Sequence, residues 1–459
     1  MTVGTIRPVI VGAGPGGIRA AQALVAHGLR PVVVDEGTAF GGQIYRRQPP
    51  NFKRSAATLY GFEATRARAV HAAMAALDAQ VDYRPQTLAW NAEPGMLDLQ
   101  HGAQLSRLEF THVIVAAGAT DRVLPLPGWT LPGVYSLGGA QVALKFQGCA
   151  VGSPIVFVGT GPLLYLVAYQ YAKAGAKVAA VLDTAAFSDK VSAMPALLRQ
   201  PVVTAKGIYY VAALRARGVP VHEGVRPLRV LGDRRVCAVV WHDAAGEHEL
   251  ACDAVAIGYG LRPETQLVDL LGCRFRFDTA GRAHVADRDA AGRTSVAGVY
   301  VAGDGAGIQG ADAAERAGER AALALLEDAG VAVDRGRAAR LERELERAGV
   351  FRTGLERAFP FPHDWAANAA DELIICRCEE VTAGALRAAI AESDVVEINR
   401  LKALTRVGMG RCQGRMCGAA ACEVLARGCG RAIDEVGRLR AQPPVKPIPM
   451  AGAPRTESA

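Results

Sequence analysis

The sequence predicts an α/β protein with two Rossmann-like domains, followed by a small, mainly helical C-terminal domain. Two glycine-rich turns, at 12–17 and 159–164, each follow a short apolar strand and precede a helix-favouring stretch. Near the C-terminus, four cysteines form two close pairs. The repeated turn predicts a repeated nucleotide-binding unit, because such a turn brings backbone N–H groups close to phosphates.

Length and composition limit the classes of protein. The chain has 459 residues, 50% hydrophobic and 21% charged, so it can bury sizeable cores in about three domains. The net charge of +7 is mild and comes without a dense basic run, which argues against nucleic-acid binding. Ten cysteines without a signal-peptide pattern favour the cytoplasm, and a peripheral position at the inner membrane face stays open. No apolar stretch is long enough to predict a transmembrane helix.

The first glycine-rich turn has the surroundings of a dinucleotide fingerprint. Gly12, Gly14 and Gly17 follow an apolar strand. In this pattern the glycines allow a tight turn, a close approach of backbone to a pyrophosphate, and close packing of helix on strand. An acidic residue about 20 positions further on receives the ribose hydroxyls. Glu36 is the preferred candidate, with Asp35 in reserve.

The segment after the second strand indicates which nucleotide binds. Residues 41–46 read Gly-Gly-Gln-Ile-Tyr-Arg and resemble thioredoxin-reductase-like flavoproteins, in which this segment passes close to the flavin. The resemblance implies FAD at the first site, with Gly42 and Gln43 among its contacts. Residues 45–47 line either the flavin cleft or a solvated loop.

Two later strands return to the same site in that class of flavoprotein. One ends at Gly118 and the other at Gly303 and Asp304. The resemblance implies that Asp304 binds the ribityl and pyrophosphate region of FAD, and a carboxylate suits ribityl hydroxyls as an acceptor. The alternative role is an N-cap of the helix expected at 311–329, which the intervening residues 305–310 disfavour.

The second turn departs from the fingerprint. Gly159 and Gly161 take the first two positions, but Leu164 stands where a third glycine would let helix and strand approach. This bulky residue puts NAD(P) binding in doubt, and the domain is expected to keep its fold with or without a nucleotide. No Arg directly follows the second strand at 176–182, which disfavours NADP in particular.

A thioredoxin-reductase-like enzyme needs a redox dithiol beside its flavin, and this chain has no Cys-x-x-Cys. In its place, residues 145–150 carry only Cys149. Disulfide reductase activity is therefore excluded. No histidine stands in a recognisable substrate-base motif, so catalytic residues stay unassigned.

Residues 185–215 lengthen the second domain beyond the compact unit. Pro195, Pro201 and Gly207 are expected to interrupt any long helix. The apolar run 208–210, Ile-Tyr-Tyr, is either a surface for a partner protein or part of the local core.

The C-terminal cysteine pairs predict a metal centre. Cys376 with Cys378 and Cys412 with Cys417 supply the four thiolates that a [2Fe-2S] cluster needs. Structural zinc prefers two to four residues between paired cysteines, so the one-residue gap of the first pair disfavours zinc. Buried, inert thiols are the remaining alternative.

The two cysteine motifs, at 376–382 and 405–418, resemble the bacterioferritin-associated-ferredoxin type of [2Fe-2S] domain. The resemblance implies that the four paired cysteines ligate the cluster. Cys422 and Cys429 lie outside the pattern, so it implies that they do not.

These assignments divide the chain into five expected parts. They are an FAD-binding domain of the glutathione- and thioredoxin-reductase type at 1–125 and 259–333, an NAD(P)-binding-like domain at 126–258, a linker at 334–369, the [2Fe-2S] domain at 370–432 and a flexible tail at 433–459.

From about 5 to 430 the chain resembles the alpha subunits of opine oxidases, D-hydroxyproline dehydrogenases and bacterial hydrogen cyanide synthase. Residues 41–46, 159–164 and the cysteine motifs carry the resemblance. It implies one subunit of a flavin-dependent oxidoreductase that acts on CH-NH donors. A D-amino-acid-oxidase-like beta subunit, often with a small iron–sulfur gamma subunit, would oxidise the amine, and this chain would pass electrons to an acceptor such as a quinone. The alternatives are a stand-alone NAD(P)H:acceptor oxidoreductase and a non-enzymatic iron–sulfur storage or sensing protein.

Overall fold

The computed structural model describes residues 6–449, which form two compact units. The first unit contains the chain up to 119, residues 262–349 and the segment from 440 onward, and the second contains 120–261 and 350–439. The chain therefore passes between the units four times. At the first two crossings, strand β8 (Ala119–Asp121) pairs with β17 (Leu261–Pro263).

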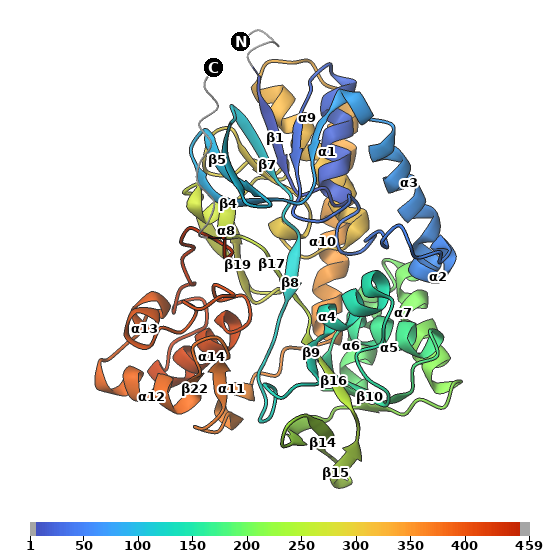
Figure 1. The fold of residues 1–459 in the computed structure, drawn as a ribbon, viewed down its shortest axis with the longest axis vertical. Helices are drawn as coiled ribbons and strands as arrows, with labels where there is room; N and C mark the ends of the chain where they lie inside the picture. The colour runs from blue at the N-terminus through green and yellow to red at the C-terminus, as the bar shows by residue number, and fades with distance from the viewer. Residues whose placement is uncertain (1–5, 450–459) are drawn as a thin grey trace. The chain divides into compact units, whose positions relative to one another are not determined.

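The first unit is built on a five-stranded parallel sheet (Figure 1). Its order is β20-β7-β1-β2-β3, and Ile10 of β1 stands beside Val33 and Ile114 of the neighbouring strands. The strands are β1 (Pro8–Val11), β2 (Val32–Val34), β3 (Asp82–Arg84), β7 (His112–Val115) and β20 (Val299–Val301).

Alternate side chains of this sheet enter two different cores, as the pleat of a strand requires. Ile10 and Ile114 face a layer of helices, α1 (Pro15–Ala26), α3 (Ala64–Ala75) and α9 (Ala311–Asp328). Val9 and Val113 face the antiparallel sheet of β4 (Thr87–Glu93), β5 (Met96–His101) and β6 (Gln104–Glu109), together with α8 (Gln266–Leu270). Smaller elements of this unit are α2 (Ala56–Tyr60), η2 (Gly61–Glu63), η3 (Asp78–Gln80), β18 (Phe275–Asp278), β19 (Ala283–Ala286) and η5 (Gly303–Ala306).

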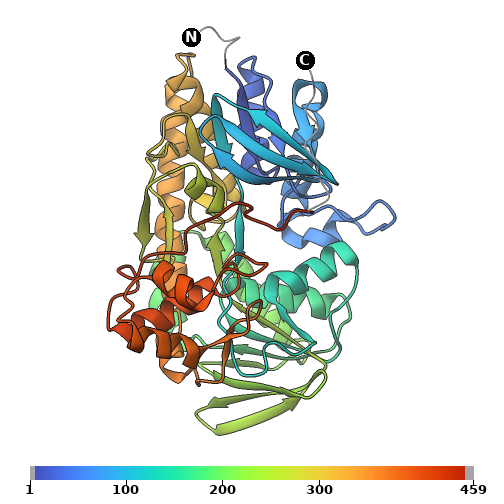
Figure 2. The same cartoon turned by 60° about the vertical axis from the view of Figure 1, so that its left-hand side comes forward.

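The second unit repeats the plan with another five-stranded parallel sheet, in the order β12-β11-β10-β16-β9. Figures 1 and 2 show this unit from two directions. Phe157 of β10 points to the helical face, whereas Val156 and Val158 point to the opposite face. The strands are β9 (Val134–Ser136), β10 (Ile155–Thr160), β11 (Val178–Asp183), β12 (Val221–Glu223) and β16 (Ala254–Tyr259). The helices are α4 (Leu137–Val142), the π-helical turn η4 (Ala143–Gln147), α5 (Pro162–Lys173), α6 (Phe187–Leu197) and α7 (Pro201–Arg215).

Pro195 and Gly207 do not interrupt these helices as expected. Pro195 lies inside α6 and Gly207 inside α7. Pro195 has no N–H to donate to the carbonyl of Val191, four residues earlier in the helix. Because Val191 is exposed, water can donate to that carbonyl instead. The chain break falls between the helices instead, just before Pro201.

The C-terminal part shares a core with the face of the second sheet that carries the antiparallel strands β13 (Arg226–Gly232), β14 (Val236–Asp243) and β15 (Gly246–Ala251). Two indoles fix it there: Trp129 Nε1 donates to Ile374 O at 2.7 Å, and Trp365 Nε1 donates to Pro125 O at 2.8 Å. Two separate helices fall between residues 383 and 405. The elements are α11 (Trp365–Asn368), β21 (Ile374–Cys376), β22 (Val381–Thr382), α12 (Ala383–Glu392), α13 (Ile398–Thr405) and α14 (Gly418–Cys429).

Two further stretches contact the first unit. Most of the stretch expected as a linker, 334–369, is α10 (Arg335–Ala358), a helix whose first half pairs with α9 through Arg337 to Glu319 at 2.6 Å and Arg316 to Glu344 at 2.6 Å. The expected tail is also held to the first unit before residue 450. Arg440 Nε contacts Asp269 at 3.0 Å and Val445 N donates to Trp90 O at 2.9 Å. The rest of that tail, 450–459, lies outside the described residues.

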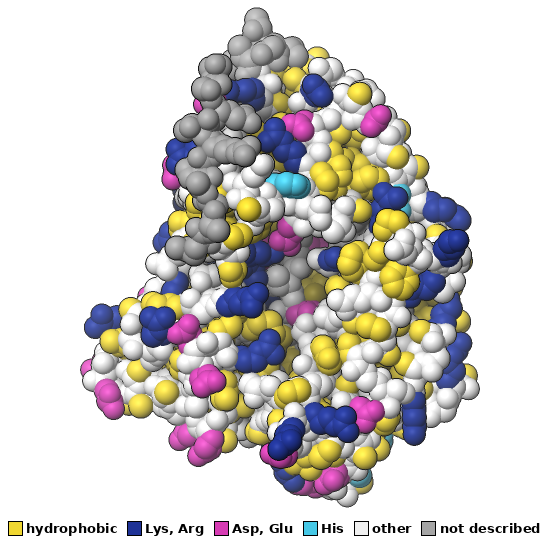
Figure 3. Space-filling view, in the orientation of Figure 1, with side chains coloured by type: hydrophobic (Ala, Val, Ile, Leu, Met, Phe, Trp, Pro, Cys, Tyr) yellow, Lys and Arg dark blue, Asp and Glu magenta, His cyan; other side chains and the backbone are white. Residues whose placement is uncertain are grey.

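The distribution of surface charge agrees with the mild net charge of the sequence, which contains no dense basic run. On the face drawn in Figure 3, Lys and Arg side chains are scattered among acidic and apolar ones and do not form one basic band. Among the described residues, no helix combines the length and the apolarity needed to cross a bilayer.

Candidate functional site

The first glycine-rich turn leaves no room for side chains. Gly12 has a φ of +106°, and a Cβ on it would lie 2.3 Å from Ala116 O. A Cβ on Gly17 would lie 1.8 Å from Gly12 O, so α1 can stand this close to the turn only with glycine there. The helix begins after Gly14, and no side chain caps its first N–H groups. They remain free for an anion.

The Gly-Gly-Gln segment is brought against this turn. Gly41 N donates to Ala13 O at 2.8 Å, and a Cβ on Gly42 would lie 2.9 Å from the Cα of Gly14. Gln43 is exposed beside this contact. The structure thus brings together residues that are 28 positions apart in the sequence, Gly14 and Gly42.

The two acidic residues after β2 have different surroundings. The Asp35 carboxylate accepts from Ala13 N at 2.5 Å and from Gly37 N at 2.6 Å, so it holds the turn in place. Burial raises its pKa, and these two N–H groups oppose the rise. Glu36 is exposed and pairs with Lys446 of the C-terminal segment. Of the two carboxylates, only that of Glu36 is exposed, and its role as the ribose contact stays a prediction.

Tyr45 belongs neither to a flavin cleft nor to a solvated loop. Its side chain is fully buried in the helical core and stands edge-on to Tyr60 at 6.2 Å between ring centroids. Arg47 is exposed and stacks over Phe40 at 4.9 Å. The two residues lie two positions apart in the sequence, and only the packing decides which one is buried.

The later strand ends meet as the flavoprotein resemblance implies. A Cβ on Gly305 would lie 3.4 Å from both backbone N and O of Gly118, and Gly303 lies 3.8 Å from the Cβ position of Gly16. Asp304 Oδ1 accepts from Gln309 N at 2.9 Å and from Gly310 N at 3.0 Å, just before α9. Although residues 305–310 separate Asp304 from α9, its carboxylate still accepts hydrogen bonds from the backbone just before that helix. Its other oxygen, Oδ2, has no partner within residues 6–449.

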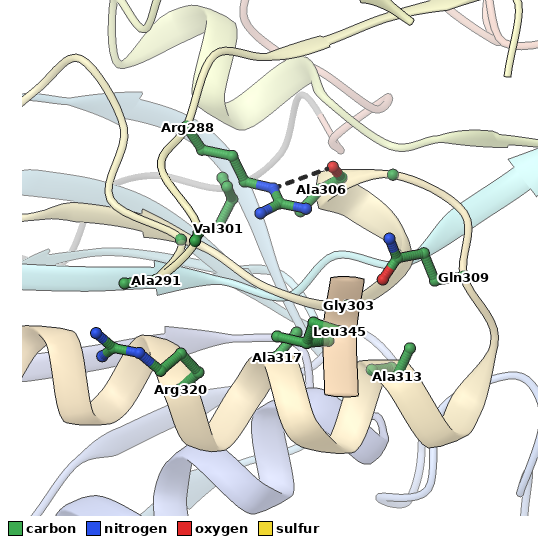
Figure 4. Close-up of a pocket in the computed structure, with 14 residues that line it drawn as sticks. Arg288, Ala291, Val301, Gly303, Ala306, Gln309, Ala313, Ala317, Arg320 and Leu345 are labelled. Carbon is green, nitrogen blue, oxygen red and sulfur yellow. Dashed lines mark hydrogen bonds between the residues drawn. The ribbon is translucent and has the colours of Figure 1, made fainter. Parts of the chain in front are cut away.

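A narrow cavity adjoins Gly303 on the side of α9 and α10 (Figure 4). Arg288 crosses it and donates to Ala306 O at 3.3 Å, while Gln309 and Leu345 line the rest. It holds about one water molecule. None of the other expected FAD contacts lines it, so it is not the flavin site.

The first unit therefore fits a dinucleotide at the first turn. The turn offers N–H groups that no side chain caps and glycines where a Cβ would clash. Beside it lie the exposed Glu36, which pairs with Lys446, and one Asp304 oxygen without a partner within residues 6–449. These are the features that a pyrophosphate, a ribose and a polyol chain require.

The second turn is shaped differently. Gly161 has a φ of +106°, whereas its counterpart Gly14 has a φ of −78°. Leu164 is fully buried and its N–H bonds back three residues to Gly161 O at 3.1 Å. In the first turn, the equivalent bond spans four residues, from Ile18 N to Gly14 O at 3.0 Å. The leucine changes how the helix begins.

The chain's own side chains engage the carboxylate of the second domain. Asp183 ends β11 and is fully buried. Its Oδ2 accepts from Tyr165 Oη at 2.6 Å and from Lys190 Nζ at 2.7 Å, and Lys190 also contacts Glu223 at 2.5 Å. The ring centroid of Phe359 lies 5.3 Å from the same ammonium. In other folds of this kind a carboxylate at this position receives a ribose, whereas here it is engaged by the chain's own side chains.

The four paired cysteines are brought together in one place. The thiol of Cys417 hydrogen-bonds to the sulfurs of Cys376 and Cys412, and Cys412 contacts Cys378. The Cys417 contact lowers the pKa of Cys376 to about 6 and that of Cys412 to about 5. Among the described residues, no three or more Cys, His, Asp or Glu side chains have the mutual geometry of a site for a single metal ion. In a cluster-bound state, bonds to iron would replace the S–H contacts.

Backbone N–H groups surround these sulfurs. Cys376 receives hydrogen bonds from Gly408 and Glu379, and Cys412 receives them from Met416 and Gly414. Such donors stabilise thiolates and tune the potential of a bound cluster. The donor set and the four thiols fit a [2Fe-2S] cluster. The remaining two cysteines of this part of the chain, 422 and 429, lie along α14, beyond both motifs.

Three important residues were missed from the sequence. A Cβ on Gly410 would lie 2.3 Å from Cys378 Cβ, so only glycine lets the two motifs approach, and its position two residues before Cys412 was a usable signal. Lys190 and Lys446 pair with carboxylates 7 and 410 positions away, and nothing in the sequence marks those partners.

Known families match this architecture. A family of pyridine nucleotide-disulphide oxidoreductases matches residues 6–318, and the BFD-like [2Fe-2S] binding domain matches residues 374–427. The opine oxidase A subunit of Rhizobium meliloti is 37% identical over 96% of this chain and 86% of its own length. The hydrogen cyanide synthase protein HcnB of Pseudomonas protegens is 32% identical over 99% of this chain and 98% of its own.

Solved structures agree in fold. L-proline dehydrogenase from P. horikoshii superposes with a TM-score of 0.70 at 20% identity, over 97% of this chain and 78% of its own. Thioredoxin reductase from T. acidophilum superposes with a TM-score of 0.52 at 20% identity, over 70% of this chain and 98% of its own. The chain thus belongs to the flavin-dependent pyridine nucleotide-disulphide oxidoreductase family, among the relatives of HcnB and of the opine oxidase A subunits that carry a BFD-like [2Fe-2S] binding domain.

Proposed function

We propose that this chain is the FAD- and [2Fe-2S]-containing electron-transfer subunit of a hetero-oligomeric amine dehydrogenase or oxidase, of the opine or D-hydroxyproline class. One observation carries the proposal: a nucleotide turn with uncovered N–H groups and four gathered thiols occur in one chain that has no Cys-x-x-Cys. A flavin exchanges electrons in pairs and a [2Fe-2S] cluster passes them singly, so the two connect amine oxidation to one-electron acceptors.

Each part of the two sites has a role in this function. The turn from Gly12 to Gly17 receives the pyrophosphate on backbone N–H groups, and Glu36 receives the ribose. Asp304 accepts from the ribityl chain through Oδ2, while Oδ1 stays on the start of α9. The thiolates of Cys376, Cys378, Cys412 and Cys417 hold the cluster.

The names of the relatives support a multi-subunit assembly, because the opine oxidase relative and HcnB are both named as subunits. We assign amine oxidation to a D-amino-acid-oxidase-like beta subunit, and we include a small iron–sulfur gamma subunit in the assembly. The electrons leave this chain for an acceptor such as a quinone, in the cytoplasm or at the inner membrane face. A subunit of hydrogen cyanide synthase is the variant of this assembly that HcnB supports.

The test is co-expression of the chain with the subunits encoded beside it, followed by dye reduction with a panel of opines and D-imino acids. Substrate-dependent reduction that requires both this chain and a second subunit is the expected result. Absence of activity with every combination would refute the proposal.

Replacement of Cys412 by Ser tests the cluster assignment within that complex. We expect the variant to keep its flavin absorbance, to lose the visible and electron-spin signals of the cluster, and to reduce dye at least about tenfold more slowly. Cys422→Ser is the matched control, because this cysteine lies outside both motifs, and the control should retain all three properties. Cluster signals that survive Cys412→Ser would overturn the assignment.

A second candidate, an NAD(P)H:acceptor oxidoreductase, has one observation in its favour. The hydroxyls of Thr160 and Thr184, beside the second turn, are buried without a hydrogen-bond partner among the described residues. A bound nucleotide would satisfy such groups. Anaerobic mixing of the isolated chain with NADH or NADPH decides between the two: rapid bleaching of the flavin supports the second candidate, and an unchanged spectrum supports the first.

A further inference from the structure

The helices α6 and α7 carry an exposed apolar surface on the second unit. More than half of the large apolar side chains that are exposed among residues 6–449 fall between 187 and 209. We call this the α6–α7 surface; its main residues are Phe187, Val191, Leu198, Val202, Ile208 and Tyr209, exposed by 65, 53, 58, 68, 59 and 43%. A patch of this kind marks an interaction site more often than a free surface.

α7 is apolar on two sides. Its inner side packs Ala213 and Leu214 into the core below the sheet, while its outer side presents Val202 and Ile208. A helix at a free surface has one apolar stripe and a polar opposite face, whereas a helix that is apolar all round is buried.

Basic side chains predominate around this surface. Arg199, Lys206 and Arg217 lie in or beside the helices, and α7 contains no acidic residue. On α6 the one carboxylate, Asp189, accepts from Ala186 N at 2.9 Å and belongs to the helix start. A two-fold contact with a second copy would bring these like charges together. The rim instead suits a protein whose own rim is acidic.

The aromatic residues also favour a protein over a lipid surface. Tyr209 stands edge-on to Tyr169, with centroids 5.8 Å apart and the two hydroxyls 3.4 Å apart. Tyrosine and arginine are enriched where proteins meet, because each offers an apolar body with a polar end. A helix that lies on a membrane has a strong contrast between its two faces, which α7 lacks.

We propose that the α6–α7 surface docks the amine-oxidising subunit of the assembly, through an apolar groove rimmed by carboxylates on that subunit. This inference rests on the function proposed above. It resolves the open choice for residues 208–210: Ile208 and Tyr209 face the partner, and Tyr210 packs partly into the local core.

The test uses Ile208→Asp and Val202→Asp in the full chain, co-expressed with the subunits encoded beside it. Both side chains are more than half exposed, so the variants should fold and keep flavin and cluster spectra. Recovery of the amine-oxidising subunit with a tagged variant should fall about tenfold or more, because a carboxylate would be buried against an apolar, acid-rimmed groove. Leu404→Asp is the control: Leu404 is an exposed apolar residue of α13, and its variant should retain the complex.

Four outcomes contradict the inference in distinguishable ways. Equal recovery of the partner by Ile208→Asp and the unchanged chain refutes the docking surface and leaves the proposed function intact. Failure of the unchanged chain to recover any subunit refutes both. A homodimer in sedimentation that Ile208→Asp dissociates assigns the surface to a second copy. Binding to phosphatidylglycerol vesicles that the same change abolishes assigns it to the membrane.

Discussion

The two Rossmann-like halves of this chain have the same kind of parallel sheet and glycine-rich turn, but they differ in the side chains at the turn where a nucleotide would bind. In the first, Gly17 lets α1 stand against the turn and leaves its N–H groups uncovered. In the second, the buried Leu164 occupies the equivalent position and the following helix begins with a tighter turn. A shared fold therefore does not carry a shared ligand; the side chains of a few positions decide it.

The carboxylates at the strand ends show the divergence most clearly. Asp35 and Asp183 each accept an N–H from the residue two positions on, at 2.6 and 2.9 Å. The second oxygen of Asp35 holds the glycine-rich turn, whereas that of Asp183 holds Tyr165 and Lys190. One carboxylate thus organises a binding turn, and the other organises the core of its own domain.

Transfer of the second turn's leucine into the first should have the largest effect. A Cβ at position 17 would overlap Gly12 O at 1.8 Å, so Gly17→Leu must push α1 away from the turn and remove the phosphate position. We expect almost no flavin in the purified variant, measured as visible absorbance per chain. The reciprocal change, Leu164→Gly, is the control and should leave flavin content unchanged. Full flavin in Gly17→Leu would show that the close approach is not required.

Removal of the central cation of the second domain should have an intermediate effect. Lys190→Met leaves the fully buried carboxylate of Asp183 without its counter-charge. Breaking a buried pair of this kind costs about 3–5 kcal/mol, so the free energy of unfolding should fall by roughly that amount in urea denaturation. Lys173→Met, at an exposed lysine of α5, serves as the control and should change it by less than about 0.5 kcal/mol.

The double variant Lys190→Met with Asp183→Asn sharpens this test. It removes the unpaired charge as well as the cation, so most of the lost stability should return. A single Lys190→Met variant that is as stable as Lys173→Met would mean that the network is not what holds this domain closed.

The smallest effect concerns Lys145, in the π-helical turn η4. Burial lowers its pKa from 10.5 to about 8. Below pH 8 it is charged in both the folded and the unfolded state, and the cost of burying that charge is constant. Between pH 8 and 10.5 the unfolded state binds more protons, so the free energy of unfolding should rise with pH across that window.

Lys145→Met should remove this cost, raising the free energy of unfolding at pH 7 by about 3 kcal/mol and flattening the pH profile above pH 8. The measurement is thermal unfolding of both proteins from about pH 7 to 10, the range over which the two states differ in charge. Lys173→Met again provides the control, and its profile should parallel that of the unchanged chain. A Lys145→Met variant less stable at neutral pH would mean that the lysine makes a contact worth more than its burial costs.

The fold was predictable because its signals are local. Glycines at fixed spacing, the strands around them and the helix at 311–329 can all be recognised within short stretches of sequence. The same holds for the candidate cluster site, whose four cysteines lie in two short motifs. Contacts between distant segments were not predictable: the pairing of Glu36 with Lys446, the burial of Tyr45 and the shared core behind Trp129 depend on packing that no local pattern encodes.

The role of α10 could not be seen in its composition alone. A charged helix such as α10 looks like a linker in the sequence, because charge does not show that its side chains pair with Glu319 and Arg316 on the preceding helix α9. The exposed α6–α7 surface was visible only as an apolar run at 208–210, since exposure is a property of the folded chain.

The four crossings between the units have a consequence for how the protein is made. Neither unit is a continuous stretch of chain, and the first receives its contact from Val445 only after the second unit has left the ribosome. During synthesis, the first unit therefore lacks its last segment until the second unit and the cysteine motifs have been made. No single cut at a unit boundary would therefore yield either unit as one intact, separately expressible fragment.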